Sequence, residues 1–500
     1  MHPLSAAETE VAGELAALRP DLVAGFEAGL PGARAAVLTR LWRALAHEPL
    51  PWIERARDEH ADGVTLRLTD GRRLHGPTPD PYATDAYVQV VRLDRTAYED
   101  PARLLTDLAV PPADGFAAEI AHSVASLALS RAAAPPPDPE VWPSRDWEWE
   151  QRVVDGHPYH PNCRARPGFS VAEQFAYAPE HRPLVRLGLL PVPGDACLVA
   201  GDWPDGLRDG SRLLVPVHPW QSAHVLKRPH DRESPAHPLM SLRTLALPGG
   251  PHVKTALSAR LTSSVRDISV PSVTSSAVLS AFAERLAERT DGLLHITRTL
   301  GAVTDGTPEL AAVLRESPEV YAGQGERVVP VAALTTTALP GSSAWLERFA
   351  RLALTVGLRL LDLGVALEAH GQNLLVVLDS TGAPLRLVYR DLADIRISPA
   401  RLARHGIAVP EELPARIRTD DQDALRRKLF GSLVAGTLAA TAGSGPVLGS
   451  TLEAVVGDLA PTADLDALRR GPVPAKALTW MRLTPDRAGD LWVELPRPPR

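Results

Sequence analysis

The chain has only two cysteines, Cys163 and Cys197, among its 500 residues. This number excludes a disulfide framework and any metal or iron–sulfur site that needs four thiolates. Basic residues are not in excess either, because 53 Lys and Arg against 60 Asp and Glu give a formal net charge of -7. Since charges of both signs are mixed along the chain, we expect neither a nucleic acid nor an anionic membrane as a partner.

Long hydrophobic runs are also missing. No stretch approaches the roughly 18 apolar residues that span a bilayer, and the N-terminus lacks the basic start and apolar core of a secretory leader. We therefore expect a cytoplasmic protein without a membrane segment. Apolar residues make up 45% and charged residues 23% of the chain, which suits two or three packed globular domains.

A proline-rich segment divides the chain. The run AAAPPPDPEVWP, Ala132 to Pro143, cannot be helical at its three successive prolines and favours an extended linker. The expected domains are a mostly helical region at 1–135, a β-rich region at 144–340 and a helical region with a small sheet at 341–500. Apolar spacing predicts helices near 6–18, 34–47, 113–131, 272–289 and from Gly341 to about Leu367, and strands at 64–68, 86–93, 212–217 and 241–247. The predicted fold class is α+β with mixed or antiparallel sheets.

The first polar cluster is GHPYHPNCRARPGFS, residues 156–170. Its prolines keep His157, His160, Arg164 and Arg166 on a rigid, non-helical segment, where guanidinium groups can grip phosphate. The alternative is that the two histidines are structural or bind zinc. The sequence leaves both interpretations open.

The second cluster lies at 241–269, where PGGP at 248–251 predicts the turn of a hairpin. If Leu247 pairs with His252, Lys254 faces Leu245, and the two-residue period puts Arg243 and Lys254 on one side of the sheet. An extended continuation from Lys254 adds further residues to that side. The predicted polar residues on it are Ser241, Arg243, Lys254, Thr262 and Arg266. Such a surface suits a triphosphate and a carboxylate, while the alternative is a solvated sheet face with scattered charges.

The third cluster, EAHGQNLLVVLDSTGAPLRLVYRD, occupies 368–391. A turn near Asp379 joins two strands, and symmetry about it puts Gln372 and Asn373 beside Arg390 and Asp391. Glu368, Asn373 and Asp391 then supply hard oxygen ligands, which suit Mg²⁺ held together with substrate phosphates. The alternative is a surface hairpin whose polar ends are only capped.

These segments together resemble a known family. In their order and spacing they are similar to the motifs of the aerobactin-synthetase (IucA/IucC) type of non-ribosomal-peptide-synthetase-independent siderophore synthetases, over roughly 144–490. The matching segments are GHPYHP with Arg164 and Gly168, VPVHPWQ at 215–221, Ser241 with Arg243 and Thr244, Lys254, Thr262 with Arg266, Glu368 with His370, Gln372 and Asn373, and Arg390 with Asp391. One departure is Arg164, which stands where the family usually carries Lys. It keeps the positive charge but presents it on a planar guanidinium group.

The resemblance implies a cupped enzyme with thumb-like, fingers-like and palm-like parts, with ATP between the middle and C-terminal parts, often as a homodimer. It implies that a citrate-, succinyl- or related carboxylate attacks ATP to give an acyl-adenylate. An amine, hydroxylamine or alcohol then forms an amide or ester, with release of pyrophosphate and AMP. The identities of the carboxylate and the nucleophile stay open.

Residue roles follow from the resemblance alone. It implies that His157, His160, Arg164, Ser241, Arg243, Thr244 and Lys254 hold the ATP phosphates. It implies that Thr262, Arg266, His370 and Gln372 orient the carboxylate and, with Lys254, form the catalytic group. It implies that Glu368, Asn373 and Asp391 bind Mg²⁺.

Three rival interpretations remain at this point. A small-molecule kinase has a similar metal-binding half, but Gly371 and Gln372 stand where a kinase places its catalytic Asp before the Asn. A non-catalytic iron-siderophore protein is a second rival, because the C-terminal part of the family resembles ferric reductases. Those carry a cysteine-held cluster, and no Cys follows Cys197. A binding-only homologue is the third.

Overall fold

The N-terminal region combines helices with a small sheet. The computed structural model describes residues 4–110, 113–262, 264–487 and 489–499. Helices α1 (Ala6–Leu18), α2 (Val23–His47), α3 (Pro101–Leu108) and α4 (Ala113–Ala133) flank a five-stranded antiparallel sheet. Its strands in order are β1 (Ile53–His60), β2 (Gly63–Leu68), β3 (Arg73–Gly76), β4 (Val91–Leu93) and β5 (Thr96–Tyr98). The predicted helices 6–18 and 113–131 and the strand 64–68 are confirmed, whereas only 91–93 of the predicted strand 86–93 is a strand.

The middle region is built on a nine-stranded sheet with the order β7-β16-β17-β12-β11-β10-β6-β9-β8. All of its pairs are antiparallel. The strands are β6 (Val185–Pro193), β7 (Leu198–Gly201), β8 (Arg208–Asp209), β9 (Arg212–Val217), β10 (Glu233–Pro238), β11 (Thr244–Ala246), β12 (His252–Thr255), β16 (Thr299–Thr304) and β17 (Ala311–Arg315), and a separate hairpin joins β13 (Leu257–Leu261) to β14 (Ser264–Arg266). The predicted strand 212–217 is confirmed as β9.

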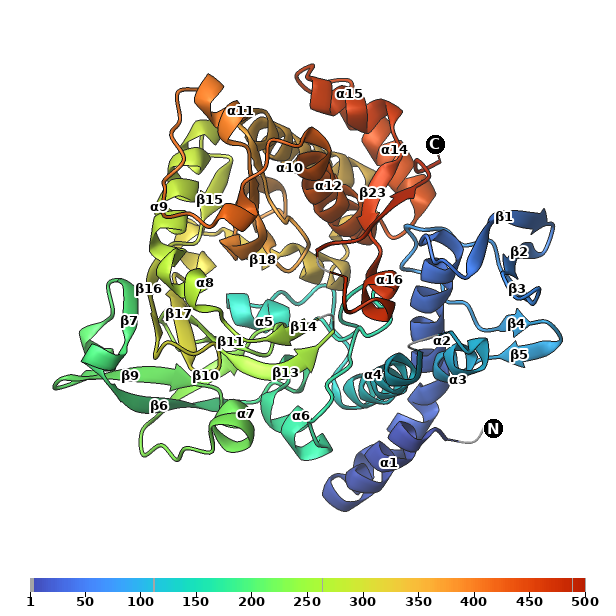
Figure 1. Ribbon diagram of the computed structural model, residues 1–500, viewed down its shortest axis with the longest axis horizontal. Helices are drawn as coiled ribbons and strands as arrows, with labels where there is room; N and C mark the ends of the chain where they lie inside the picture. The colour runs from blue at the N-terminus through green and yellow to red at the C-terminus, as the bar shows by residue number, and fades with distance from the viewer. Residues whose placement is uncertain (1–3, 111–112, 263, 488, 500) are drawn as a thin grey trace.

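Short helices precede these strands or connect them. They are α5 (Asp146–Glu150), α6 (Val171–Tyr177), α7 (Pro219–Gln221), α8 (Val270–Thr274) and α9 (Ser276–Ala287). The helix predicted at 272–289 is therefore two helices. Figure 1 shows α5 between the nine-stranded sheet and the C-terminal region, near the centre of the molecule.

The C-terminal region is helical around a four-stranded mixed sheet, β15-β21-β20-β18. Its strands are β15 (Leu294–Ile296), β18 (Arg327–Pro330), β20 (Leu374–Leu378) and β21 (Pro384–Tyr389), with the short pairs β19 (Val365–Ala366) with β22 (Arg396–Ile397) and β23 (Val473–Lys476) with β24 (Trp492–Leu495). Its helices are α10 (Ser343–Leu363), α11 (Pro399–Arg404), α12 (Gln422–Ser432), the π-helical turn η12 (Leu433–Leu438), α13 (Ala439–Ala442), α14 (Gly445–Val456), α15 (Ala463–Arg470) and α16 (Leu478–Leu483).

The long apolar helix ends earlier than its sequence pattern indicates. We predicted helix to about Leu367, but α10 stops at Leu363, where Gly364 adopts φ 110° and caps it. Only glycine takes this left-handed geometry without strain, so the residue ends the helix. Val365 and Ala366 continue the apolar run because β19 is buried, not because they are helical.

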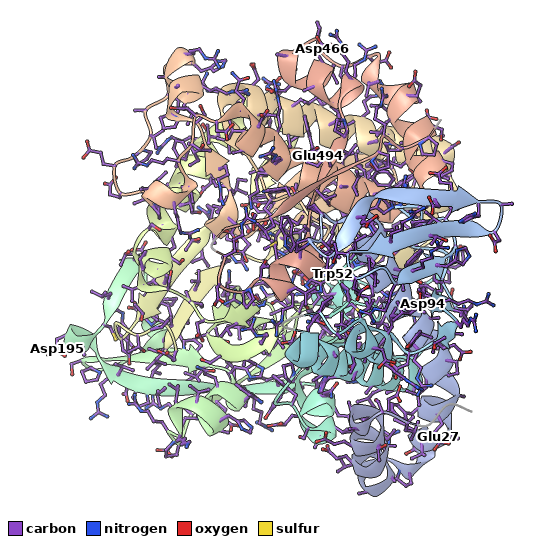
Figure 2. The ribbon with its side chains drawn as sticks, turned by 45° about the vertical axis from the view of Figure 1, so that its right-hand side comes forward. Glu27, Trp52, Asp94, Asp195, Asp466 and Glu494 are labelled. Carbon is purple, nitrogen blue, oxygen red and sulfur yellow. The ribbon has the colours of Figure 1, made fainter. Side chains whose placement is uncertain are left out.

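Separate hydrophobic cores support the three regions. One lies between α2, α4 and the five-stranded sheet, a second inside the nine-stranded sheet, and the largest around α10, α12 and the mixed sheet. Figure 2 marks Glu27, Asp195 and Asp466 at three different edges of the molecule, one in each region. Within the described residues, no helix has the length and apolar character needed to cross a bilayer.

Candidate active site

The centre of the candidate site is an ion pair between the middle and C-terminal regions. Lys254 Nζ of β12 lies 2.9 and 2.7 Å from Asp391 Oδ1 and Oδ2, just after β21. Asp391 has φ 71°, an unfavourable value for a residue with a Cβ. Strained backbone of this kind persists only where its surroundings fix it, and it concentrates at functional sites.

The register of the β11–β12 hairpin differs from our prediction. Ala246 pairs with His252, Leu245 with Val253 and Thr244 with Lys254, one residue away from the predicted pairing of Leu247 with His252. Leu247 instead pairs through its backbone with Pro251, so the loop is shorter. Lys254 therefore faces Thr244, and Arg243 lies in the turn before the strand begins.

Arg243 nevertheless reaches the same place as Lys254. Its carbonyl accepts hydrogen bonds from the Thr255 amide and hydroxyl, and its Nη1 donates to the carbonyls of Arg266 and Asp267. Arg266 comes back to this point because the chain reverses at the β13–β14 hairpin, not because it continues extended as predicted. Both guanidinium groups lie within the electrostatic reach of Asp391.

Arg315 is a fourth cation in this group, and sequence reasoning missed it. It ends β17, where it pairs with His252 across the sheet, and Asp391 and Glu150 act on its charge. The sequence around it carries only a strand pattern, so no local signal marks it. Four cations therefore interact electrostatically with Asp391: Arg243, Lys254, Arg266 and Arg315.

The charges shift the pKa values within the central pair. Burial lowers the pKa of Lys254 to about 8, helped by Arg243 and Arg315 and opposed by Asp391. Burial acts in the opposite direction on Asp391, but Lys254 and Arg315 outweigh it and hold the pKa of this carboxyl well below its usual range. At neutral pH both groups are charged, and Lys254 is close to its titration range.

Glu368 is held by two lysines that the sequence did not point to. Its Oε1 lies 3.0 Å from Lys428 Nζ of α12 and 2.8 Å from Lys476 Nζ of β23. Although burial raises it, these lysines and His370 lower the pKa of Glu368 to about 2. Lys428 and Lys476 lie 60 and 108 residues further along the chain, which is why no motif near Glu368 predicted them.

The segment from Glu368 to Asn373 is tied down by its neighbours. Arg390 donates from its backbone N–H to the Asn373 carbonyl and from Nε to the Gln372 carbonyl, as hairpin symmetry predicted. The Ala369 amide donates to the Ser432 hydroxyl, and the Thr437 hydroxyl of η12 donates to the Ala369 carbonyl. The side chains of Glu368, His370 and Asn373 are thus presented from a fixed backbone.

The proposed magnesium ligands fit the ion in kind. Asn373 Nδ2 donates to the Glu368 carbonyl at 3.4 Å, which leaves its Oδ1 without a donor among the described residues. The Tyr389 hydroxyl contacts the Glu368 amide and the Asp391 carbonyl, so these two residues flank one phenol. No group of three or more His, Cys, Asp and Glu side chains in the described residues is arranged to hold a metal, and the predicted trio is two carboxylates and an amide.

The histidines of the first cluster lie next to these groups. His157 is exposed, yet dense surrounding protein and the nearby His160 and His370 lower the pKa of its imidazole well below the ordinary value. Burial and Arg266 lower the pKa of His160 to about 3, and burial lowers that of His370.

The remaining predicted residues differ in position. Ser241 Oγ accepts from the Thr244 amide, so both lie in the turn that carries Arg243. Thr262, with φ 56°, forms the reversal between β13 and β14. Arg164 is occupied elsewhere, since its guanidinium contacts the buried Glu180 and the carbonyls of Val153 and Val154. The structure therefore gives Arg164 an internal partner and does not bring it to the group around Asp391.

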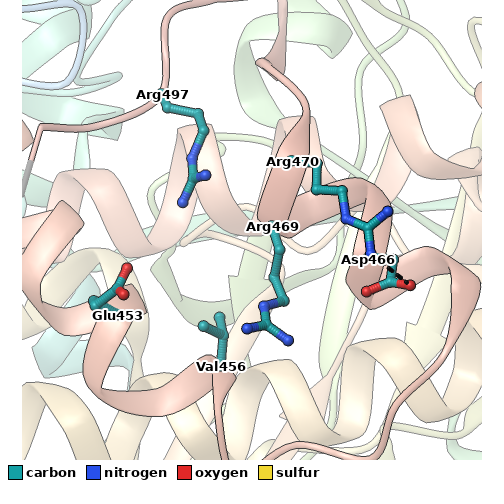
Figure 3. A pocket seen from close by; sticks show the side chains of 6 residues that line it. All are labelled: Glu453, Val456, Asp466, Arg469, Arg470 and Arg497. Carbon is teal, nitrogen blue, oxygen red and sulfur yellow. Dashed lines mark ion pairs between the residues drawn. The ribbon is translucent and has the colours of Figure 1, made fainter.

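A hollow of about 260 Å³ lies apart from this group (Figure 3). It opens beside α14 and α15, and its lining residues are Glu453, Val456, Asp466, Arg469, Arg470 and Arg497. None of them is a predicted site residue. The hollow is therefore a separate surface feature of the C-terminal region.

Two segments of the chain match known protein families. Residues 146–336 match the IucA / IucC family, and residues 343–460 match the ferric iron reductase FhuF-like transporter family. The chain is 25% identical over 309 residues to the citryl-spermidine/3,4-dihydroxybenzoyl-citryl-spermidine:spermidine ligase of Bacillus anthracis, covering 49% of the chain and 50% of that relative. The chain spans about half the length of the curated relatives it matches.

Solved structures extend the likeness over the whole chain. The petrobactin biosynthesis protein AsbB of Bacillus anthracis matches with a TM-score of 0.74 at 18% identity, covering 99% of this chain and 98% of AsbB. ATP-bound aerobactin synthetase IucA of Klebsiella pneumoniae matches with a TM-score of 0.69 at 19% identity, covering 93% and 99%. At this identity the solved structures show that the chain shares the fold of these synthetases, and residues 146–336 match the IucA / IucC family.

Proposed function

We propose that this protein is an ATP-dependent ligase that adenylates a carboxylic acid and transfers the acyl group to an amine, hydroxylamine or alcohol. The observation that carries the proposal is the meeting of Arg243, Lys254, Arg266 and Arg315 around Asp391, next to the oxygen ligands near Glu368. A carboxylate attacking a triphosphate brings two anions together, and fixed cations offset their repulsion.

The reaction has two balanced steps. A carboxylate oxygen attacks the α-phosphorus of ATP, the bond from that phosphorus to the bridging oxygen breaks, and pyrophosphate leaves. The nitrogen or oxygen of the acceptor then attacks the acyl carbon, the bond to AMP breaks, and the acceptor loses its proton. The product is an amide or ester.

Different side chains bind the phosphates and the carboxylate in this proposal. Arg243 and Lys254, with Ser241, Thr244 and the His157–His160 segment, contact the phosphates. Arg266 recognises the carboxylate, since its planar fork suits two oxygens, and Thr262 and Gln372 position it. His370 is neutral near pH 7 because burial lowers its pKa, so it orients the carboxylate without adding charge.

Mg²⁺ would be held by Glu368, Asn373 and Asp391. It would neutralise charge on the triphosphate there. Lys254, Lys428 and Lys476 pair with the two carboxylates. This arrangement keeps charge in a partly buried site compensated.

Several wider expectations belong to the same proposal. We propose three parts at 1–135, 144–340 and 341–500 that correspond to thumb, fingers and palm, with ATP between the second and third. The N-terminal part and the nine-stranded sheet each have a core of their own, while the largest core joins 341–500 to residues of the middle part such as Trp149 and Leu294. We also propose a cytoplasmic homodimer that acts on small molecules. Because relatives are named as citryl-spermidine and D-ornithine–citrate ligases, citrate is the first carboxylate to test.

The products of ATP separate this proposal from a kinase. The protein is incubated with Mg²⁺, α-labelled ATP and each of citrate, succinate and 2-oxoglutarate, with hydroxylamine or a polyamine as acceptor. We expect labelled AMP, with equimolar pyrophosphate that depends on the carboxylate. Labelled ADP would instead assign kinase chemistry, and no ATP consumption across the panel would leave a binding-only protein.

A further inference from the structure

We propose that Glu150 is a positioning residue that fixes the two halves of the nucleotide site to each other. It is not a residue that the sequence motifs point to, and it touches neither proposed substrate. The inference rests on the proposed function, because it concerns the same site. Its geometric part, a single buried carboxylate that holds two separate segments, can be tested without turnover.

Glu150 makes two contacts in opposite directions. It is the last residue of α5, its side chain is 1% exposed, and its Oε1 lies 2.6 Å from Arg390 Nη1. Its Oε2 accepts a hydrogen bond of 2.9 Å from the Met240 amide. One oxygen therefore serves the C-terminal region and the other serves the middle region.

The contact with Arg390 reaches the proposed metal ligands. Arg390 precedes Asp391 directly, and its Nε donates to the Gln372 carbonyl at 3.0 Å while its amide donates to the Asn373 carbonyl. The guanidinium is thus shared between Glu150 and the backbone that carries Asn373. Without the carboxylate, a 6% exposed cation would be left without its charge partner.

The contact with Met240 reaches the proposed phosphate ligands. Met240 lies in the tight turn from Leu239 to Thr244, closed by hydrogen bonds from Leu242 N to Leu239 O and from Leu239 N to Thr244 O. Leu242 has φ 61°, which is unfavourable for a bulky side chain. Ser241 and Arg243 flank it. The carboxylate of Glu150 thus fixes a strained turn that carries Ser241 and Arg243, two of the proposed phosphate ligands.

Both segments that Glu150 holds contain a strained residue. Leu242 and Asp391 are two of the eight non-glycine residues with positive φ in the described chain. Such conformations persist only when surrounding contacts determine them. Glu150 supplies such contacts, because its buried carboxylate contacts both segments.

Helix α5 is a rigid support for this carboxylate. Trp149 beside Glu150 is 1% exposed within the largest core, and Asp146 at the other end lies 2.7 Å from His252 at the start of β12. The Asp146 amide also donates to Glu319. The position of Glu150 is therefore set from both ends of its helix.

The test compares two buried carboxylates in the same protein. Glu150→Gln keeps the size but removes the charge, and its single carbonyl oxygen cannot replace both the oxygen at Arg390 and the oxygen at the Met240 amide. The matched control is Asp464→Asn, which removes the charge from the buried pair of Arg401 and Asp464, at 2.6 Å and similarly buried. Hydrogen exchange of the full chain followed by mass spectrometry, and the Kd for MgATP, are measured for both variants and the wild type.

We expect Glu150→Gln to speed exchange at the amides of 240–244 and of 373–374 together, and to weaken MgATP binding roughly 10- to 100-fold, as loss of supporting contacts does at metal sites. Asp464→Asn should change neither. If Glu150→Gln does not fold, Glu150→Asp is used, because its shorter side chain cannot reach Met240 and Arg390 together. Faster exchange in only one segment, or exchange like that of Asp464→Asn, would overturn the proposal.

The two proposals fail differently. If the wild type neither binds MgATP nor releases pyrophosphate, the proposed function is wrong. Faster hydrogen exchange of both segments in Glu150→Gln would still establish that Glu150 holds them. If the wild type is active and Glu150→Gln keeps wild-type Kd and exchange, Glu150 has no positioning role.

Discussion

Single side chains in this site carry charge in an environment that disfavours it. Lys254, Arg243 and Arg266 are all cations whose pKa values burial lowers, and each is compensated by Asp391. A bound triphosphate would add negative charge at this point and so favour the charged cations. The cations of this site therefore outnumber Asp391, their shared carboxylate partner, which suits the binding of a further anion.

The pH dependence of adenylation should report the titration of the Lys254 ammonium group. Because its pKa is about 8 in the free protein, its charge is present below that pH and lost above it. We expect kcat/KM for ATP, measured by pyrophosphate exchange so that the acceptor amine plays no part, to fall as pH rises through about 8. Lys254→Arg, which stays charged, should shift that fall to higher pH. An unchanged profile in Lys254→Arg would assign the titration to another group.

We expect Arg266 to contribute to catalysis through the planar geometry of its guanidinium group as well as through its charge. Arg266→Ala removes a cation that faces Asp391, and we expect kcat/KM for the carboxylate to fall by an amount on the order of 2–5 kcal/mol in activation free energy. Arg266→Lys should recover part of the loss, because it restores charge without bidentate contact. Circular dichroism checks the fold. Near-normal rates for Arg266→Ala would remove the residue from the mechanism.

Residues close together in sequence were predicted, and their distant partners were not. The Gln372–Asn373 pairing with Arg390 follows from hairpin symmetry across one turn, and the structure confirms it. Lys476 and Glu150 reach the site from β23 and α5, whose sequences carry only ordinary strand and helix patterns. Long-range ion pairs leave no periodic signal, so sequence reasoning had no means to find them.

At the scale of elements, two boundaries decide where the site residues point. The β11–β12 register sets Thr244 opposite Lys254, and the end of α10 at Leu363 frees the chain to reach Glu368 as an irregular segment. Sequence reasoning placed both elements but shifted both boundaries. The loop of the hairpin and the burial of β19 are tertiary effects that alternate pairing and apolar content do not reveal.

The glycine cap of α10 provides a test at this scale. Gly364 has φ 110°, and a Cβ there would lie 2.7 Å from the Arg401 Cβ and 3.0 Å from the Ser398 carbonyl. Gly364→Ala should lower the free energy of unfolding by at least about 1–2 kcal/mol, the cost of the left-handed conformation alone. The control is Gly341→Ala, where no atom lies within 4 Å. Equal urea midpoints for both variants would contradict this account.

At the scale of the whole molecule, the N-terminal region packs against the end of the chain. Glu48 at the end of α2 accepts hydrogen bonds from the Thr479 and Trp480 amides, and Glu119 of α4 pairs with Arg482 at 2.6 Å. The Tyr82 hydroxyl donates to the Pro496 carbonyl. The three-part division along the sequence therefore does not mean that the parts are independent in space.

Cutting the linker should therefore not separate the pieces. We expect a protein with a protease site inserted between Pro136 and Glu140, an exposed stretch, to elute as one species after cleavage, even in 1 M salt. Salt screens buried pairs weakly, so contacts at Glu48 and Glu119 should persist. The uncleaved insertion variant is the control. Elution as two species would show that the linker alone joins the N-terminal region to the rest.

The π-helical turn η12 affects the direction in which the residues of this helix point. Through this turn Thr437 meets the Ala369 carbonyl, next to Glu368 and His370. A π-helical turn holds about one residue more than an α-helical turn. If the same residues formed ordinary α-helix, the residues at the end of the turn would be rotated by up to about 100° from their present direction. The width of this turn, as much as the identity of its residues, therefore sets the direction in which Thr437 points.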